Sequence, residues 1–231
     1  MRPETSTGRH LAADVVLVTC CGATAAWLVA RAVTAVAGDR NAPWILGRAS
    51  GIAGYLLLVA LAGTGLVLSH PWTARWRRPG PIARLRLHAG LAVFTFAFLA
   101  LHVVVLATDR YAKVGWWGAL LPMASEYRPA AVTLGVVGAW CGLLTGLTAA
   151  LAGRLAGRFW WPLHRLALGC LVLVWLHSVL AGSDTSALRW MYLGSAVALA
   201  LLAFSRYAAT NRGDRLRALA GARPPTGGVT L

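Results

Sequence analysis

The sequence predicts an all-α integral membrane protein, a bundle of six transmembrane helices with both termini in the cytoplasm. Three observations lead to this prediction. The 231-residue chain is 58% hydrophobic and only 13% charged, which is far from the balance of a soluble domain. Its apolar residues gather in long runs, and its basic residues are unevenly divided between the segments that join those runs.

Six apolar runs are each long enough to cross a hydrocarbon core, which takes about 20 residues. Backbone polar groups in lipid must be bonded within their own segment, so each run is expected to be a helix. The runs cover residues 11–36, 49–69, 85–107, 130–152, 163–182 and 187–204. The membrane domain therefore extends over 11–204, between a short cytoplasmic N-terminus at 1–10 and a basic tail at 205–231 that is expected to be disordered.

The first run has a second interpretation as a signal peptide, because Ala35-Val36-Ala37 resembles a small-residue cleavage site. A signal peptide has a hydrophobic region of only about 7 to 15 residues, however. The run at 11–36 is longer than that. We therefore expect a retained helix.

The basic residues predict the orientation in the membrane. The segments on the side of the two termini carry 15 of the 22 Lys and Arg residues, and the other side carries 7. By the positive-inside rule, both termini are expected in the cytoplasm of a multi-pass cell-membrane protein, with the bacterial cytoplasmic membrane the expected location. The basic residues interrupt apolar segments and form no separate domain, so the partner of this surface is membrane lipid rather than nucleic acid.

Four histidines form a pattern inside the predicted helices. His88 and His102 lie fourteen positions apart in the third run, and His164 and His177 lie thirteen positions apart in the fifth. At about 1.5 Å per residue, each spacing covers roughly 20 Å of helix. Both helices run outward in the predicted topology, so His88 shares a cytoplasmic depth with His164, and His102 an outer depth with His177. Two opposed imidazoles at one depth are what a six-coordinate haem iron requires.

The helical geometry places both histidines on one face of the helix in the third run but not in the fifth. A fourteen-position spacing brings His88 and His102 within about 40° of one face, whereas a thirteen-position spacing leaves His164 and His177 about 140° apart on a straight helix. The fifth helix must therefore bend, overwind or begin with a non-helical turn near Pro162. Two alternatives remain open: four unrelated histidines each bonded to a neighbouring helix, and ligands for a transported metal such as zinc, which would have to converge within a few Å.

The paired spacings and one local stretch carry a resemblance to a known family. The stretch is Phe159-Trp160-Trp161-Pro162-Leu163-His164-Arg165-Leu166. With the six-helix layout, it resembles the ferric reductase-like transmembrane domain, shared by ferric reductases, NADPH oxidases and the haem subunit of periplasmic methionine sulfoxide reductase, over about residues 49–204. The resemblance implies two b haems, the inner one held by His88 with His164 and the outer one by His102 with His177. Electrons would pass from a cytoplasmic flavin to an outer acceptor.

The chain departs from ferric reductases and NADPH oxidases because only the short segment 205–231 follows Phe204, and no G-x-G-x-x-G motif follows a strand. FAD and NAD(P)H are thus expected only through a separate cytoplasmic flavoprotein. The predicted function is that of an oxidoreductase subunit which transfers electrons across the membrane to ferric iron, dioxygen or an extracytoplasmic redox partner. The alternatives are a haem-bearing membrane anchor for a separate periplasmic redox enzyme and, from another class, a metal or solute transporter.

Other residues have weaker predicted roles near the haems. Arg84, Arg86 and Arg165 lie at the inner depth, where a guanidinium can pair with a haem propionate, although the positive-inside bias also accounts for them. Thr95 and Leu99 lie on the histidine face between the two levels and are expected to pack against porphyrin. His70, beside Pro71, is either a structural interfacial residue or a group at a haem edge.

Overall fold

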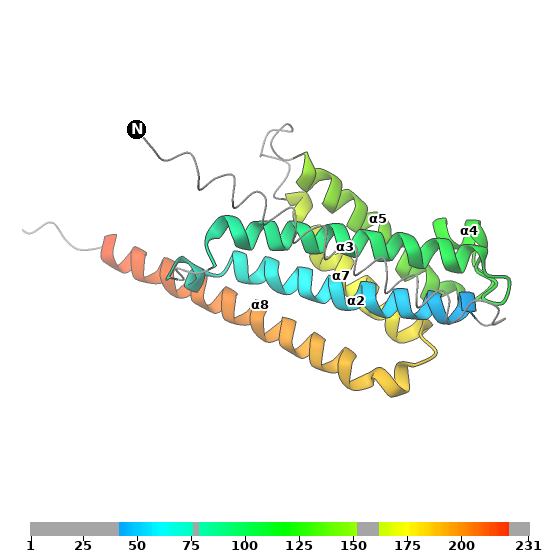
Figure 1. Ribbon diagram of the computed structural model, residues 1–231. Coiled ribbons are helices and arrows are strands. Elements are labelled where there is room, and N and C mark those ends of the chain that lie inside the picture. The colour runs from blue at the N-terminus through cyan, green and yellow to red at the C-terminus, as the bar shows by residue number, and fades with distance from the viewer. Residues whose placement is uncertain (1–41, 76–78, 152–161, 222–231) are drawn as a thin grey trace, which may run out of the picture. The chain divides into compact units, whose positions relative to one another are not determined.

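The computed structural model describes residues 42–75, 79–151 and 162–221, and every regular element within these ranges is a helix (Figure 1). In chain order the elements are α2 (Ala42–Leu68), the 3-10 helix η1 (Pro71–Arg75), α3 (Pro81–Thr108), α4 (Gly115–Leu120), α5 (Pro129–Ala150), α7 (Leu166–Ala181) and α8 (Thr185–Gly221).

Five helical segments are long and apolar enough to cross a membrane: Ala42–Leu68, Pro81–Thr108, Pro129–Ala150, Pro162–Ala181 and Thr185–Thr210. They coincide with five of the six predicted runs, and the all-helical, multi-pass membrane class is confirmed at that level. The first run at 11–36, together with its interpretation as a signal peptide, lies outside the described residues.

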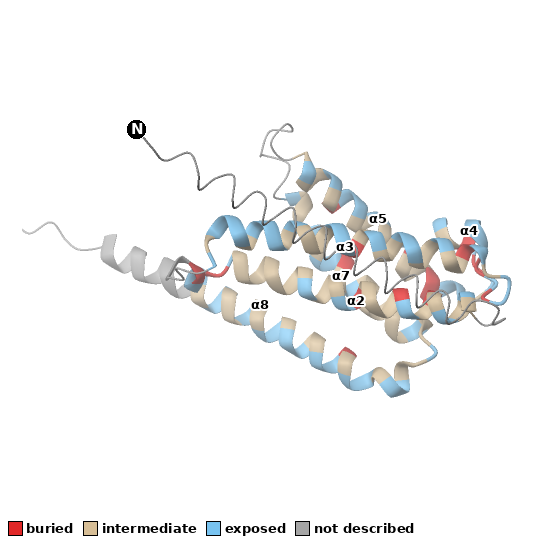
Figure 2. Ribbon diagram, in the orientation of Figure 1, coloured by how far each residue is buried: buried red, intermediate tan, exposed pale blue. Residues whose placement is uncertain are grey.

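The distribution of exposed side chains fits a lipid environment. Large apolar side chains such as Val93, Leu168 and Phe204 are 67 to 73% exposed. Among the described residues, Figure 2 shows buried positions scattered over the helices and the connecting loops. Water would penalise so much exposed apolar surface, whereas lipid tails do not. Trp72, Trp116, Trp117 and Trp190 are also exposed and lie near helix ends, where amphipathic rings suit the membrane interface.

The helices that carry the histidines each pair with an antiparallel neighbour. On α2, Gly47 faces Leu106 and Gly65 faces His88 of α3, so these two helices run in opposite directions. Helices α5 and α7 pack closely together, with Gly138 facing Leu173 and Val174. By contrast, α3 and α7 run parallel and make at most marginal backbone contact. Side chains therefore occupy the space between α3 and α7.

Helix α8 runs parallel to α2 and is held to it by polar contacts. The hydroxyls of Tyr55 and Ser195 lie 2.6 Å apart, and the rings of Tyr55 and Tyr192 meet edge to face. The indole N–H of Trp175 on α7 donates to the Tyr192 carbonyl at 3.1 Å. These contacts give α8 partners on both α2 and α7.

The structure differs from the predicted disordered tail. Helix α8 continues to Gly221, so residues 205–221 are helical, and only 222–231 lie outside the described residues. This part of the sequence is rich in Ala, Arg and Leu, which are strong helix formers. A helix already begun in the membrane can extend through them without a new nucleation step.

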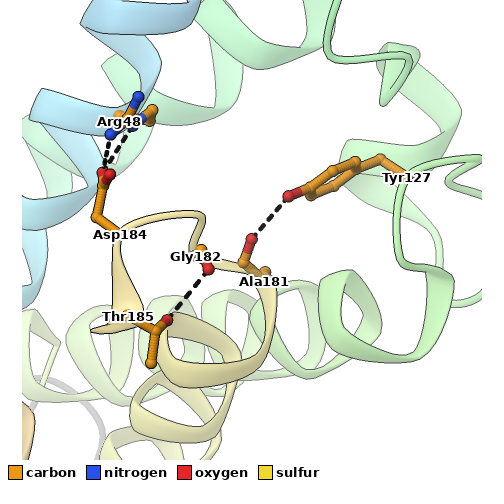
Figure 3. Close-up of polar contacts among 6 residues, drawn as sticks. All are labelled: Arg48, Tyr127, Ala181, Gly182, Asp184 and Thr185. Atoms are coloured by element: carbon orange, nitrogen blue, oxygen red, sulfur yellow. Dashed lines mark hydrogen bonds and ion pairs between the residues drawn. The ribbon is translucent and has the colours of Figure 1, made fainter. Parts of the chain in front are cut away.

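The end of the bundle near His177 is fixed by a polar cluster (Figure 3). Arg48 of α2 forms an ion pair with Asp184, and its Nε donates to Oδ2 of the same carboxylate at 2.7 Å. The Tyr127 hydroxyl donates to the carbonyl of Ala181 at 2.9 Å, and Arg128 donates to that of Leu180 at 2.6 Å. These bonds satisfy carbonyls of the last turn of α7, which have no partner within the helix.

We predict that Asp184→Asn lowers stability modestly, because it removes the charge that links α2 to the start of α8. The two side chains are 37% and 32% exposed, so solvent screening limits the loss to no more than about 1 kcal/mol. Thermal unfolding in detergent, followed by tryptophan fluorescence, measures it. Glu126→Gln, at an exposed acid of the same end, is the control. Equal unfolding temperatures for Asp184→Asn and wild type would contradict the prediction.

Candidate functional site

The structure brings the four membrane histidines together as two pairs, the 88/164 pair (His88 and His164) and the 102/177 pair (His102 and His177). The ring centroids are 6.4 Å apart in both pairs, and the ring planes are inclined by 67° in the first and 80° in the second. All four side chains are half-buried. The two pairs lie at two levels of the same pair of parallel helices.

An irregular turn at Arg165 accounts for the spacing of His164 and His177. His164 precedes α7, which begins at Leu166. The N–H of Arg165 donates to the Pro162 carbonyl, and that of Leu168 donates to the Arg165 carbonyl, both in the tighter i to i−3 pattern. A 3-10 turn rotates the chain by about 120° per residue rather than about 100°. This overwinding turns His164 toward the face of His177, in the direction that the straight-helix estimate requires.

The ring separation suits a metal ion held between two imidazoles. A metal–imidazole bond is about 2.0 to 2.1 Å, and a ring nitrogen lies about 1.1 Å from the ring centroid, given C–N bonds of about 1.33 Å. Two such bonds in line therefore separate the centroids by about 6.3 Å. The observed 6.4 Å agrees with this value at both levels.

The 102/177 pair is oriented by backbone carbonyls on two other helices. His102 Nδ1 lies 2.7 Å from the carbonyl oxygen of Gly47 on α2, and His177 Nδ1 lies 2.8 Å from that of Ala131 on α5. A carbonyl only accepts, so each Nδ1 carries the proton and donates it. Each Nε2 is then left with its lone pair, the protonation state of a metal ligand whose orientation is held from behind.

His88 has a hydroxyl in the corresponding position. Thr64 on α2 donates its proton to the Leu61 carbonyl at 2.9 Å, and its oxygen lies 3.1 Å from His88 Nδ1. The hydroxyl proton is thus used, and the oxygen accepts from Nδ1–H. The Leu61 carbonyl, which only accepts, also lies beside the His88 ring. His88 therefore has the same tautomer as His102 and His177, with a side-chain oxygen and a backbone oxygen near it.

The small number of protein ligands at each level favours a metal that is already bound within a cofactor over a bare metal ion. In the part of the chain that the structure describes, no three His, Cys, Asp or Glu side chains gather as they would around a bare metal ion. Structural zinc takes four protein ligands and catalytic zinc three. Each level here supplies two imidazole rings, with centroids 6.4 Å apart.

The three predicted arginines differ in their surroundings. Arg84 is half-buried and its Nη1 donates to the Thr73 carbonyl at 3.2 Å, while its buried Nε has no hydrogen-bond partner among the described residues. Arg86 and Arg165 are exposed. Of the three, Arg84 alone combines burial with an unused donor directed away from water, and it is the most suitable to bind an anion at this level.

Thr95 and Leu99 lie on α3 between the two levels, as the sequence spacing indicates. Thr95 is buried, but its hydroxyl donates to the Leu91 carbonyl of its own helix at 2.7 Å. Leu99 is half-buried, and its backbone lies beside Gly54 of α2. Their predicted contact with porphyrin stays a prediction.

His70 lies apart from both pairs, at the end of α2. It is 5% exposed and lines a small cavity with Trp72 and Ser205. The Trp72 backbone N–H donates to its Nδ1 at 3.2 Å, and Nε2 faces the Ser205 hydroxyl oxygen at 3.4 Å. Both ring nitrogens thus have protein partners, which favours the structural interpretation of His70.

Sequence reasoning missed the residues behind the rings. They are Thr64 and three glycines, Gly51, Gly65 and Gly135, that lie against His102, His88 and His177 respectively. One signal was present: Gly51-x-x-Gly54 in the second run recurs as Gly135-x-x-Gly138 in the fourth. Small residues in membrane helices usually indicate close helix contact rather than a histidine site, so this signal alone does not identify a role.

Comparison of the chain with protein-family models, with curated proteins and with solved structures finds no match. The resemblance to the ferric reductase-like domain therefore depends on the residues that carry it.

Proposed function

We propose that this protein holds two b-type haems in the membrane and passes electrons from a cytoplasmic donor to an extracytoplasmic acceptor, in the manner of a ferric reductase-like membrane domain. His88 and His164 would bind one haem, and His102 and His177 the other. The observation that carries the proposal is the 6.4 Å separation of opposed imidazole rings at both levels.

The residues present fit haem in three respects. Each level offers two imidazoles whose nitrogens would be ligands on opposite sides of the iron, and porphyrin would supply the other four. Three of the four rings have Nδ1 bonded to an oxygen, which leaves Nε2 for a metal. Helices α3 and α7 do not pack closely together, as expected for helices that hold a flat group between them. Bound haem would supply one-electron redox chemistry at each level.

The chain itself would bind, orient and insulate. The histidines fix two levels about 20 Å apart along α3, which covers most of a hydrocarbon core of about 30 Å. The exposed apolar faces of the helices keep water away from both levels when lipid surrounds them. Arg84 at the 88/164 level, with its unused Nε, would bind a propionate.

The direction of transfer follows from the 15 to 7 division of basic residues. It would place the 88/164 pair at the cytoplasmic side and the 102/177 pair outside. A separate cytoplasmic flavoprotein would then supply electrons at the first level. Ferric iron, dioxygen or a partner enzyme would receive them at the second. One alternative function is a haem-bearing anchor for a periplasmic redox enzyme, which would use the same histidines. The other is a metal or solute transporter, which would lack the absorbance of a reduced b haem.

We predict that the purified protein contains close to two haems per polypeptide. Alanine at His88 or His164 should remove the haem of the first level, and alanine at His102 or His177 that of the second, because a haem that keeps one axial ligand is held weakly. Extraction as the pyridine haemochrome measures the stoichiometry. His70→Ala, at a histidine outside both pairs, is the control and should retain both haems. Full haem content in all four variants would show that the ligand assignment is wrong.

The orientation predicts the side of the C-terminus. A reporter fused after Leu231 should behave as cytoplasmic, because the segments on that side carry most of the basic residues. A fluorescent protein that matures only in the cytoplasm should be bright there, and an exported phosphatase should be inactive. Phosphatase activity at this site would invert the topology and exchange the inner and outer levels.

The electron donor is predicted to be a separate flavoprotein. It would dock on the face formed by the segments around 71–84 and 153–162 and by the C-terminal tail, of which 76–78, 153–161 and 222–231 lie outside the described residues. This face is rich in Arg, so docking should weaken as salt screens the charges. NADPH alone should leave the haems oxidised, whereas NADPH with a flavin reductase should reduce them, more slowly at high salt.

Absorbance in a stopped-flow instrument follows the reduction. Rapid reduction by NADPH without added protein would contradict the donor prediction. Reduction by a membrane quinol would contradict it as well, since electrons would then enter from the lipid rather than at the Arg-rich face.

A further inference from the structure

Helices α2 and α5 present equivalent positions to the 102/177 pair. On α2, the Gly47 carbonyl bonds to His102 and Gly51, one helical turn later, lies against the ring. On α5, the Ala131 carbonyl bonds to His177 and Gly135, one helical turn later, lies against the ring. The same sequence offset therefore relates Gly47 to Ala131 and Gly51 to Gly135.

The correspondence extends one helical turn further. Gly54, two turns after Gly47, faces Phe98 and Leu99, which lie one turn before His102. Gly138, two turns after Ala131, faces Leu173 and Val174, which lie one turn before His177. The α2–α3 and α5–α7 hairpins therefore approach their histidines with one geometry, as two structural repeats would.

We propose that Gly51 and Gly135 are equivalent positioning residues, each of which leaves room for one imidazole of the 102/177 pair beside the carbonyl that orients it. The inference rests on the proposed haem function and adds to it the residues that fix the angle between the two ligand planes. For His88, Gly65 leaves the room, and the Thr64 hydroxyl and the Leu61 carbonyl are the oxygens beside the ring.

Contact distances show why these positions require glycine. A Cβ at Gly51 would lie 2.8 Å from Cε1 and Nδ1 of His102, and one at Gly135 would lie 2.7 Å from Nδ1 of His177. Both distances are too short for any real contact, so the ring would have to move. At Gly65 the nearest His88 atom would be 3.2 Å away, which requires a smaller shift.

The direction of the effect follows from the position of the carbonyls. Gly47 and Gly51 are on the same helix, so a methyl group at 51 pushes the ring away from α2 and lengthens its bond to the Gly47 carbonyl. The same holds for Gly135 and Ala131 on α5. An Nδ1–H bond to an oxygen makes an imidazole a more basic ligand, which favours ferric iron. Weakening that bond should raise the midpoint potential of the haem.

The test uses single alanine variants of the full-length protein in detergent. Gly51→Ala and Gly135→Ala should shift the low-spin EPR signal and raise the midpoint potential of the same haem, the one lost in His102→Ala. Gly65→Ala should affect the other haem, to a smaller degree. Gly63→Ala on α2 is the matched control, because its Cβ would meet only Leu199 at an ordinary 3.8 Å.

A second substitution tests the His88 bond without adding bulk. Thr64→Val removes one of the two oxygens beside His88 and leaves the Leu61 carbonyl. It should raise the potential of the 88/164 haem alone, by a small amount, whereas Thr64→Ser retains the hydroxyl and should keep the wild-type value. Selective loss of one haem in a glycine variant would support the same assignment. Equal change in both haems, or no change beyond that in Gly63→Ala, would overturn it.

One measurement needs no variant. The g values of a bis-imidazole haem depend on the angle between the ligand planes, and the ring inclinations of 67° and 80° predict strongly anisotropic signals for both haems. Signals typical of parallel planes would refute the positioning proposal and leave haem binding intact. Absence of haem from the wild-type protein would instead refute the proposed function, so the two failures are distinguishable.

Discussion

The hydrogen bond between a histidine Nδ1–H and an oxygen on a neighbouring helix is the interaction on which the site depends. A polar ring inside lipid must find a partner within the protein. A helical carbonyl already accepts an N–H from the next turn but keeps a second lone pair. The Gly47 and Ala131 carbonyls offer that lone pair to His102 and His177, and a glycine at the next turn leaves the approach open.

This constraint explains how the helices around the site are spaced. Helices α2 and α5 must lie near α3 and α7 respectively, because they supply the oxygens behind the rings. Helices α3 and α7 then face each other across two imidazoles and have only marginal backbone contact. Usual interhelical distances of about 8 to 10 Å would leave no space for opposed rings. The packing of α2 on α3 and of α5 on α7 therefore determines the gap between α3 and α7.

The sequence was sufficient to predict the long-range part of this arrangement. Hydropathy located five described helices, and the spacings in the third and fifth runs paired His88 with His164 and His102 with His177. The thirteen-position spacing predicted a bend, overwinding or a non-helical turn near Pro162, and the structure has i to i−3 bonds around Arg165. Periodicity alone did not specify which of these distortions occurs, because the bond pattern depends on local backbone geometry. It also did not predict that residues 205–221 extend α8. The prediction of disorder used the basic composition of this segment, and composition does not show whether a preceding helix continues.

The groups behind the rings could not be predicted for a different reason. A backbone carbonyl has no sequence signature, and a glycine in a membrane helix has many uses. Only the relative placement of α2 against α3 and of α5 against α7 shows that Gly51 and Gly135 occupy equivalent positions. Once that equivalence is known, the shared spacing of Gly51-x-x-Gly54 and Gly135-x-x-Gly138 can be recognised as a feature of the histidine site.

The two levels are not built identically, and the difference has a chemical consequence. Each ring of the 102/177 pair donates to one backbone carbonyl. His88 has both the Thr64 hydroxyl and the Leu61 carbonyl beside it, and Arg84, one helical turn away on α3, adds positive charge at that level. If the proposed haem is bound at the 88/164 pair, this charge would favour its reduced form. Electrons would then be retained at the first level, so net transfer to the second would have to be driven by the donor and the acceptor.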